Sequence, residues 1–416
     1  MRSELRFTAS MALAVGVASG VEVPAAAQVA ATAARQAAAS GRAAGTERRI
    51  RISPFVEATS ETNVLRVTPG TTLNGRNNDN RLSPGVTVDV LVPASTVQLF
   101  ASGTLAYDFY RYNKQLNRER ILLDAGASAP AGECRGTAAV NFARQQSDLA
   151  DLRLTGATTL KNTEQRLAPR VGINCGRAVG LNSSLTYEHA RVTNSSALRQ
   201  FGDFESDTLT GSVGLARPSL GQVSLVSSLT RGRYINRLVP NGRRETVTSS
   251  NVGVQINRQV GRFRGYLQGG VTHVNSNNPF VSSFTGPSYS GGLDGRLGAA
   301  TDVHLGLARA IQQSNLLGVS YSVSDALDAR VDRALTPSLR VFAAANIVNN
   351  RYDRSPLLGF GTGRFNDRIT TYSAGVSLVS ARRLAIDFTG SLLRRRGDAS
   401  VFDYNSRVLA LRLRLQ

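Results

Sequence analysis

The chain has 416 residues, 49 basic and 29 acidic side chains, a net charge of +20 and two cysteines. Beyond the N-terminal region, no stretch reaches the ~18 consecutive apolar residues of a transmembrane helix, which argues against a helically anchored protein. The basic excess is almost all arginine, since the only lysines are Lys114 and Lys161, and it is spread along the chain instead of clustering as in nucleic-acid-binding proteins.

The N-terminus has the layout of a secretory signal peptide. It combines a basic head containing Arg2 and Arg6, an apolar stretch from about Phe7 to Val17, and an alanine triplet at 25–27. We therefore predict a signal peptide over residues 1–27, cleaved after export has begun; the alternative is a short buried helix. Export argues further against nucleic acid as a partner.

The next segment, 28–48, is of low complexity, and we predict a flexible periplasmic lead-in. From there to the end, short runs of alternating apolar and polar residues repeat without a change of texture, which predicts one all-β unit over 49–416. We expect 16 to 18 strands. The predicted strands are 50–58, 81–92, 96–112, 118–129, 134–145, 163–175, 179–191, 205–216, 222–235, 245–258, 262–275, 284–299, 302–311, 316–333, 338–349, 367–379, 383–394 and 403–416.

The last of these strands shows the alternation most clearly. In "VLALRLRL", four leucines from Leu409 to Leu415 occupy every second position, and Arg412 and Arg414 lie between them. Successive side chains of a strand point to opposite faces. The leucines are therefore predicted to face lipid and the arginines a wet lumen.

The connections between predicted strands alternate in length. Short turns such as "VPAS", "GRA" and "QVG" follow every second strand, and most of the remaining connections are long and polar. The connection near 312–315 is a short exception. Tight turns at one end and long loops at the other are typical of outer-membrane barrels. The fold is therefore predicted as a closed antiparallel transmembrane β-barrel of the bacterial outer membrane; a soluble β-sandwich is the alternative.

Tryptophan is absent, so the aromatic girdle of such a barrel has to use Tyr and Phe. The residues expected there include Tyr107, Phe109, Tyr110, Tyr187, Tyr234 and Phe388.

Four segments carry a resemblance to a known family: "RLSPGVTVDV", "LTYEHARVTNSS", "FESDTLTGSVGLARPSLGQVSLVSSLTRGRYIN" and "DYNSRVLALRLRL". From about Ile50 to Gln416 the chain resembles the β-barrel porin type 2 family, outer-membrane barrels encoded with bacterial exopolysaccharide and capsule assembly genes. The resemblance implies outer-membrane lipid, the barrel assembly machinery, acidic polysaccharide and other export proteins as partners. The chain departs from outer-membrane barrels in ending on Leu415 and Gln416 instead of an aromatic residue.

No catalytic, metal-binding or cofactor-binding motif is recognisable, so neither an enzyme nor a cofactor is expected. His273 and Asn275 share a strand face as in a membrane-barrel phospholipase, but Ser276 points to the opposite face. The three histidines, His189, His273 and His304, are expected to line the lumen or its rim.

The charged positions instead predict a cationic lumen. The arginines expected to line it are Arg170, Arg264, Arg340, Arg412 and Arg414. Such a lumen attracts acidic solutes. With the family resemblance, this favours a channel or assembly partner in surface polysaccharide export. The alternatives are a general anion-preferring porin and a structural or adhesive barrel without conduction.

The two cysteines are predicted to form a disulfide. Cys134 begins the fifth predicted strand and Cys175 ends the sixth, so antiparallel pairing brings them together at the short-turn rim. The alternation places both side chains on the same face. The periplasm permits such a bridge. The alternative is a pair of free thiols.

Overall fold

The computed structural model describes residues 48–68, 76–147, 161–177, 179–314, 319–352, 365–380, 383–398 and 403–415. The predicted signal peptide and residues 28–47 of the predicted lead-in lie outside these ranges. No helix in the described part of the chain is long and apolar enough to cross a membrane.

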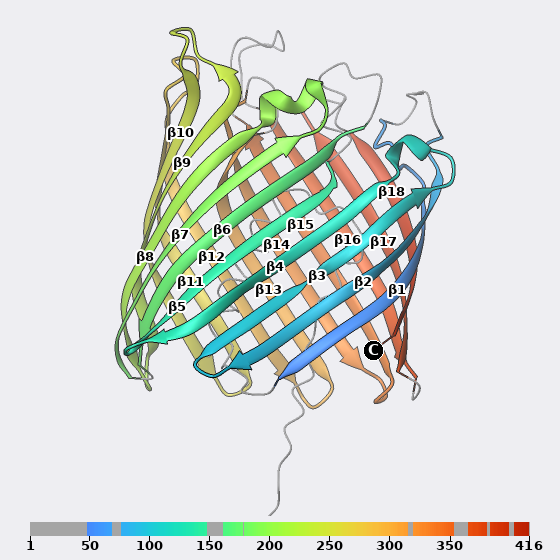
Figure 1. Cartoon of the computed structure of the whole chain (residues 1–416), viewed down its shortest axis with the longest axis horizontal. Helices are drawn as coiled ribbons and strands as arrows, with labels where there is room; N and C mark the ends of the chain where they lie inside the picture. Colours follow the sequence, from blue (N-terminus) through green and yellow to red (C-terminus); the bar gives the residue numbers. More distant parts are fainter. Residues whose placement is uncertain are drawn as a thin grey trace, which may run out of the picture.

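The chain folds into one closed antiparallel barrel of 18 strands (Figure 1). Every strand pairs with its neighbours in the sequence, and the pairing of the first strand with the last closes the sheet. The predicted fold is therefore confirmed, and each predicted strand overlaps an observed one. The strands are β1 (Arg49–Glu61), β2 (Asp79–Ala94), β3 (Val97–Tyr110), β4 (Arg118–Ala131), β5 (Cys134–Gln146), β6 (Thr163–Gly176), β7 (Gly180–Asn194), β8 (Phe204–Arg217), β9 (Gly221–Leu238), β10 (Arg244–Val260), β11 (Phe263–Ser276), β12 (Phe284–Leu297), β13 (Thr301–Gln313), β14 (Tyr321–Ala334), β15 (Leu339–Tyr352), β16 (Phe365–Val379), β17 (Leu384–Gly397) and β18 (Tyr404–Leu415).

The two ends of the barrel differ in their connections. At the short-turn end, tight turns use left-handed backbone at Ser95, Gly132, Gly261 and Gly298. The long-loop end carries the long connections and the two 3-10 helices, η1 (Lys114–Leu116) and η2 (Ala197–Gly202). Strand β1 starts and β18 ends at the short-turn end (Figure 1).

One predicted connection is wrong. The short link near 312–315 is in fact a longer connection over 314–320, because β14 begins at Tyr321. The apolar residues Leu316, Leu317 and Val319 fit a strand pattern, which is why the predicted strand began at residue 316. Val319 is instead buried outside any strand, at 1% exposure.

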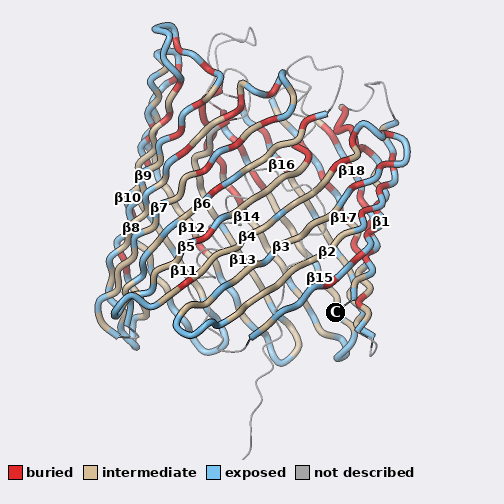
Figure 2. The backbone as a smooth tube through the Cα atoms, viewed as in Figure 1, coloured by how far each residue is buried: buried red, intermediate tan, exposed pale blue. Residues whose placement is uncertain are grey.

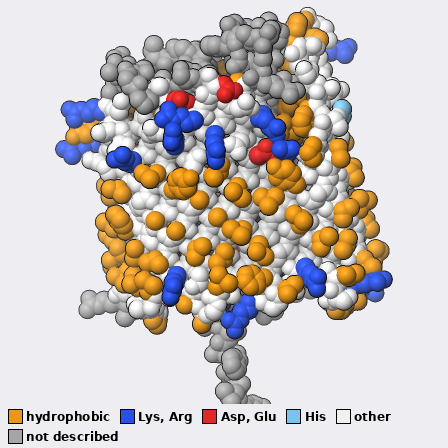
Figure 3. All heavy atoms as spheres, turned by 180° about the vertical axis from the view of Figure 1, so that it is seen from behind, with side chains coloured by type: hydrophobic (Ala, Val, Ile, Leu, Met, Phe, Trp, Pro, Cys, Tyr) orange, Lys and Arg blue, Asp and Glu red, His pale blue; other side chains and the backbone are white. Residues whose placement is uncertain are grey.

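Alternation along each strand separates an outer from an inner face. Leu409, Leu411 and Leu413 are 42–53% exposed, whereas Arg412 between them is 7% exposed. Exposed apolar side chains occur on strands all round the barrel. On the face seen in Figure 3 they form a band, bounded by basic side chains near both ends. This is the surface that a bilayer requires of a β-barrel.

Buried residues gather mainly in the part of the barrel toward the long-loop end (Figure 2). One cluster there is formed by Tyr234, Val247, Val274, Val281, Tyr321 and Val323. A second is formed by Ala326, Val348, Ile369, Leu393 and Tyr404.

Two of the six aromatic residues predicted for the outer girdle belong to the interior instead. Tyr110 is 9% and Tyr234 0% exposed, whereas Tyr107, Phe109 and their companions Tyr187 and Phe388 are 40–49% exposed on the outer face. The alternation explains the difference, because Tyr110 directly follows the outward Phe109. Adjacent aromatic residues of a strand cannot share a face.

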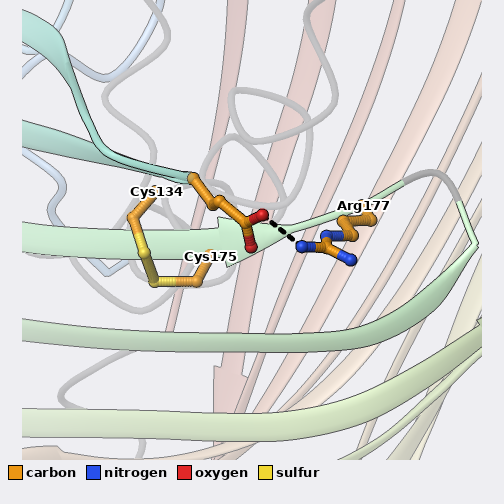
Figure 4. Close-up of a disulfide and its surroundings, with 4 residues drawn as sticks. Cys134, Cys175 and Arg177 are labelled. Carbon is orange, nitrogen blue, oxygen red and sulfur yellow. Dashed lines mark hydrogen bonds and ion pairs between the residues drawn. A yellow bond between two sulfur atoms is a disulfide. The ribbon is translucent and has the colours of Figure 1, made fainter.

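Cys134 and Cys175 lie directly opposite one another at the short-turn end of β5 and β6 (Figure 4). Their Cα atoms are 4.0 Å apart, and a disulfide joins their sulfur atoms. Both belong to the alternation of outward residues such as Val140 and Val171. Nearby, Arg177, which follows β6, forms an ion pair with Glu133 in the turn between β4 and β5.

We predict that the protein purified without reductant exposes no alkylatable thiol after unfolding. After reduction with dithiothreitol, two thiols should become available for alkylation. In the chain-entropy account, replacing both cysteines with serine costs about 4 kcal/mol in unfolding free energy, given the separation of 41 residues. Two labelled thiols in the untreated protein would refute the bridge.

A second prediction concerns curvature at a pair of facing glycines. Gly253 opposes Gly270 on the inner face, and a Cβ at Gly270 would lie 2.3 Å from the Val252 carbonyl oxygen. We expect Gly270→Val to lower the unfolding free energy by about 1–3 kcal/mol, as overpacking does. The measurement is the temperature at which the compact band of the unboiled protein disappears on a gel.

The adjacent Gly269 provides the matched control, because a Cβ there meets nothing within 4 Å. Gly269→Val should leave the transition temperature unchanged. Equal effects of the two substitutions would contradict the close approach of β10 and β11.

Candidate channel and its charged lining

The five arginines predicted to line the lumen all lie on the inner alternation of their strands. The structure divides them into two groups. Arg170, Arg412 and Arg414 contact carboxylates, whereas Arg264 and Arg340 are exposed and have no ion-pair partner among the described residues.

The three paired arginines use acidic residues of other strands. Arg170 Nη2 lies 3.0 Å from an Asp124 oxygen, across β5. Arg414 Nη2 lies 3.9 Å from Asp387 of the neighbouring β17. Neither carboxylate was singled out in the sequence, although both occupy inner positions of their strands.

A buried cluster of charges in the lumen surrounds Glu57, whose side chain is 2% exposed. Arg412 Nε lies 2.9 Å from one carboxylate oxygen, and Nη2 atoms of Arg81 and Arg120 lie 3.6 Å from the other. Asp108 is the second carboxylate of the cluster, 3.7 Å from Arg81 and 3.5 Å from Arg120. Three guanidinium groups thus share two carboxylates, which leaves a local positive excess.

Several guanidinium nitrogen atoms of this cluster have no hydrogen-bond acceptor. The Nε atoms of Arg81 and Arg120, and Nη2 of Arg120, are buried without a hydrogen-bond acceptor. The Phe55 ring lies 4.3 Å from the Arg412 guanidinium carbon, a cation–π contact that supports this side chain. Charges this well enclosed are held mainly by one another.

Several inner arginines at the short-turn end lack carboxylate partners. Arg51, Arg264 and Arg340 are exposed and form neither an ion pair nor a side-chain hydrogen bond among the residues described; we call them the mouth arginines. The carboxylate opposite Arg51, that of Asp89, contacts Arg49 at 2.9 Å instead. This end of the lumen therefore carries uncompensated positive charge.

Strands β12 to β14, between Arg264 and Arg340, hold a more balanced set of charges. His304 lies between two carboxylates, with Nδ1 2.7 Å from Asp294 and Nε2 2.9 Å from Asp328. Arg330 forms two hydrogen bonds to Asp332, at 2.6 and 2.7 Å. The described residues contain no group of three or more potential metal ligands.

The other two histidines belong to the outer face. His189 Nδ1 lies 2.9 Å from Asp207, and His273 Nδ1 lies 2.7 Å from the Thr285 hydroxyl. Ser276 belongs to the inner alternation, as its odd separation from His273 predicts. This part of β11 does not assemble a serine–histidine pair.

Residues at both ends of the connection between β13 and β14 contact side chains of β9 near the long-loop end. The Tyr234 hydroxyl of β9 donates to the carbonyl oxygens of Ser314 and Ser320, at 3.0 and 2.6 Å. Arg237 donates to the carbonyls of Ser314 and Val319, both at 2.8 Å. Since β9 and β13 are not adjacent, these bonds hold the connection across the interior.

The Glu57 cluster generates a stability prediction. Glu57→Gln removes the charge shared by Arg81, Arg120 and Arg412, and breaking a buried ion pair costs about 3–5 kcal/mol. We expect the compact band of the unboiled protein to disappear at a distinctly lower temperature. Glu133→Gln, in the exposed pair with Arg177, should cost no more than about 1 kcal/mol. Similar losses for both variants would contradict a structural role of Glu57.

Comparison with known structures gives similar barrels at low identity. The glucuronate complex of OccK2 (OpdF) from Pseudomonas aeruginosa is 10% identical, with 88% of this chain and 96% of that chain covered and a TM-score of 0.46. A BenF-like porin from Pseudomonas fluorescens Pf-5 is 11% identical, with 89% and 100% covered and a TM-score of 0.46. OccAB3 from Acinetobacter baumannii is 10% identical, with 89% of this chain and 100% of that chain covered and a TM-score of 0.45.

The comparison with curated protein sequences gives no match. The family described as Putative beta-barrel porin 2 matches residues 176–416, more than half of the chain. The family resemblance seen in the sequence is thereby confirmed, while its association with polysaccharide assembly stays a prediction. The chain belongs to the Putative beta-barrel porin 2 family and is an outer-membrane β-barrel porin.

Proposed function

We propose that this porin is a passive, anion-preferring channel for small solutes. The observation that carries the proposal is the set of mouth arginines, which face the lumen, are exposed and lack a carboxylate partner among the described residues. A narrow passage with low-dielectric walls focuses the field of such charges and raises the local concentration of anions.

The paired charges deeper in the lumen have a different effect. Pairs such as Arg170–Asp124 and Arg330–Asp332 present both signs to the water, so they keep the wall wet without strongly favouring one sign of ion. Selectivity in this proposal therefore comes from the short-turn end, which is the periplasmic end in outer-membrane barrels. The local excess at the Glu57 cluster adds to it.

Export of an acidic surface polysaccharide is the second candidate, implied by the sequence resemblance. It would use the same arginines, because uronic acids and small anions are attracted by the same field. Ser314, Val319 and Ser320, which are buried and bonded to Tyr234 and Arg237 inside the barrel, take up interior space that a polymer would need. This supports small solutes over a polysaccharide chain.

The mouth arginines can be tested by electrical recording. In planar bilayers with a salt gradient, we expect the reversal potential to indicate anion preference, strongest below about 0.1 M salt, where the screening length exceeds ~10 Å. Replacing Arg51, Arg264 and Arg340 together with glutamine should move the permeability ratio of anion to cation toward one. Conductance without any change in selectivity would refute their role.

The matched control removes three arginines from the outer face of the same end. Arg217, Arg258 and Arg333 are exposed and lie on the outward alternation, so Arg→Gln at all three changes the net charge equally. Selectivity should then stay at the wild-type value. A barrel that conducts no ions in the bilayer would instead indicate a structural or adhesive role. Loss of surface polysaccharide on gene deletion, with solute uptake unchanged, would favour export.

A further inference from the structure

Outward-facing charges near the long-loop end are mostly compensated by neighbours. Arg144 Nε lies 2.5 Å from Glu119, and Arg309 Nε lies 2.5 Å from Asp325. Asp325 also contacts Arg351, at 2.9 Å. On β7 to β9, Glu205 contacts Arg233 at 2.6 Å and Arg191 at 3.7 Å. The outer surface at this level is therefore built largely from ion pairs.

Three arginines of adjacent strands differ from this pattern. Arg368 of β16, Arg394 of β17 and Arg407 of β18 are all exposed, and each is the fourth residue from the long-loop end of its strand. The guanidinium groups of all three form no ion pair and no hydrogen bond within the described part of the chain. We call these three residues the arginine patch.

The strand register brings the members of the patch together. Arg394 lies directly opposite Thr370 on one side and Asn405 on the other. It is therefore diagonal to Arg368, two residues before Thr370, and to Arg407, two residues after Asn405. Diagonal neighbours on one face of an antiparallel pair are ~7–8 Å apart.

A fourth arginine makes the crowding of charge more severe. Arg368 lies directly opposite Arg396, and like charges at directly opposed positions destabilise a strand pair. Arg396 is compensated by Asp403, at 3.0 Å, but that carboxylate forms no bond to Arg368, Arg394 or Arg407. The patch thus keeps a positive charge that a bound anion would neutralise.

The surroundings of the patch indicate where this anion comes from. Immediately toward the middle of the barrel lie the outward side chains of Tyr372, Leu392 and Leu409, each 53% exposed. They belong to the apolar band, and basic side chains follow its upper boundary (Figure 3). The arginines are therefore placed where lipid headgroups meet the acyl chains. Thr370 and Asn405, beside Arg394, add polar side chains at the same level.

We propose that the arginine patch binds the phosphate groups of the phosphorylated glycolipid that forms the outer leaflet of the outer membrane. Guanidinium groups bind phosphate through paired N–H donors, and a headgroup with two phosphates can contact several arginines at once. The chain places the patch at the extracellular side, because long loops mark that side in outer-membrane barrels. The inference rests on membrane location and not on the proposed channel activity.

The test uses the full-length porin in detergent, with lipid binding followed by native mass spectrometry. The probes are diphosphorylated lipid A, its dephosphorylated form and phosphatidylglycerol. We expect diphosphorylated lipid A to bind best. Replacing Arg368, Arg394 and Arg407 with glutamine should weaken its binding by about ten- to a hundredfold, since each arginine near a charged lipid surface contributes roughly 1 kcal/mol. The lysine triple variant should retain part of the affinity.

The control is the glutamine triple variant at Arg217, Arg258 and Arg333, with the same charge change at the opposite end of the outer face. It should bind lipid A as the wild type does, and the compact gel band checks that every variant is folded. Equal binding of dephosphorylated lipid A, or an equal loss in the control, would overturn the proposal. Ion selectivity in bilayers should be unchanged by the patch variant, which separates a failure here from a failure of the channel proposal.

Discussion

The structure depends on one constraint, the closure of the backbone hydrogen-bond ladder. A sheet in contact with lipid cannot leave its edge N–H and C=O groups unpaired, because no water is present to satisfy them. The pairing of β1 with β18 removes both edges. Once the sheet is closed, every strand has an inner and an outer face, and the period of two assigns each side chain to one of them.

Closure also determines which charges meet. Glu57 is placed beside Arg412 because β1 and β18 are neighbours in the closed barrel, although they lie at opposite ends of the sequence. Buried charges of this kind are tolerated only when paired, since desolvation of an isolated ion is far more costly than a lost contact. The Glu57 cluster is therefore a consequence of ring closure as much as of local sequence.

The features that could be predicted from the sequence are those that depend only on the alternation of side chains and on the length of the turns. The inner positions of Arg170 and Arg412 and the opposition of Cys134 and Cys175 follow from counting residues within strands and across one turn. The sequence did not predict the carboxylate partners of the arginines, which depend on a register between strands. It also misplaced Tyr234, because a local count of aromatic residues does not show which of them contacts the connection between β13 and β14.

The net charge of +20 is distributed by the same geometry. Inner and outer charges are largely paired across neighbouring strands, but the mouth arginines inside the short-turn end and the arginine patch outside the long-loop end are not. Each set faces a region where anions are available, solutes in the lumen and lipid phosphates at the membrane surface. The two sets lie at opposite ends and on opposite faces of the wall, farther apart than the ~8 Å over which salt screens charges at physiological strength. Each therefore acts on its own anion, and a mostly paired barrel can carry a large basic excess without the repulsion that a clustered charge would cause.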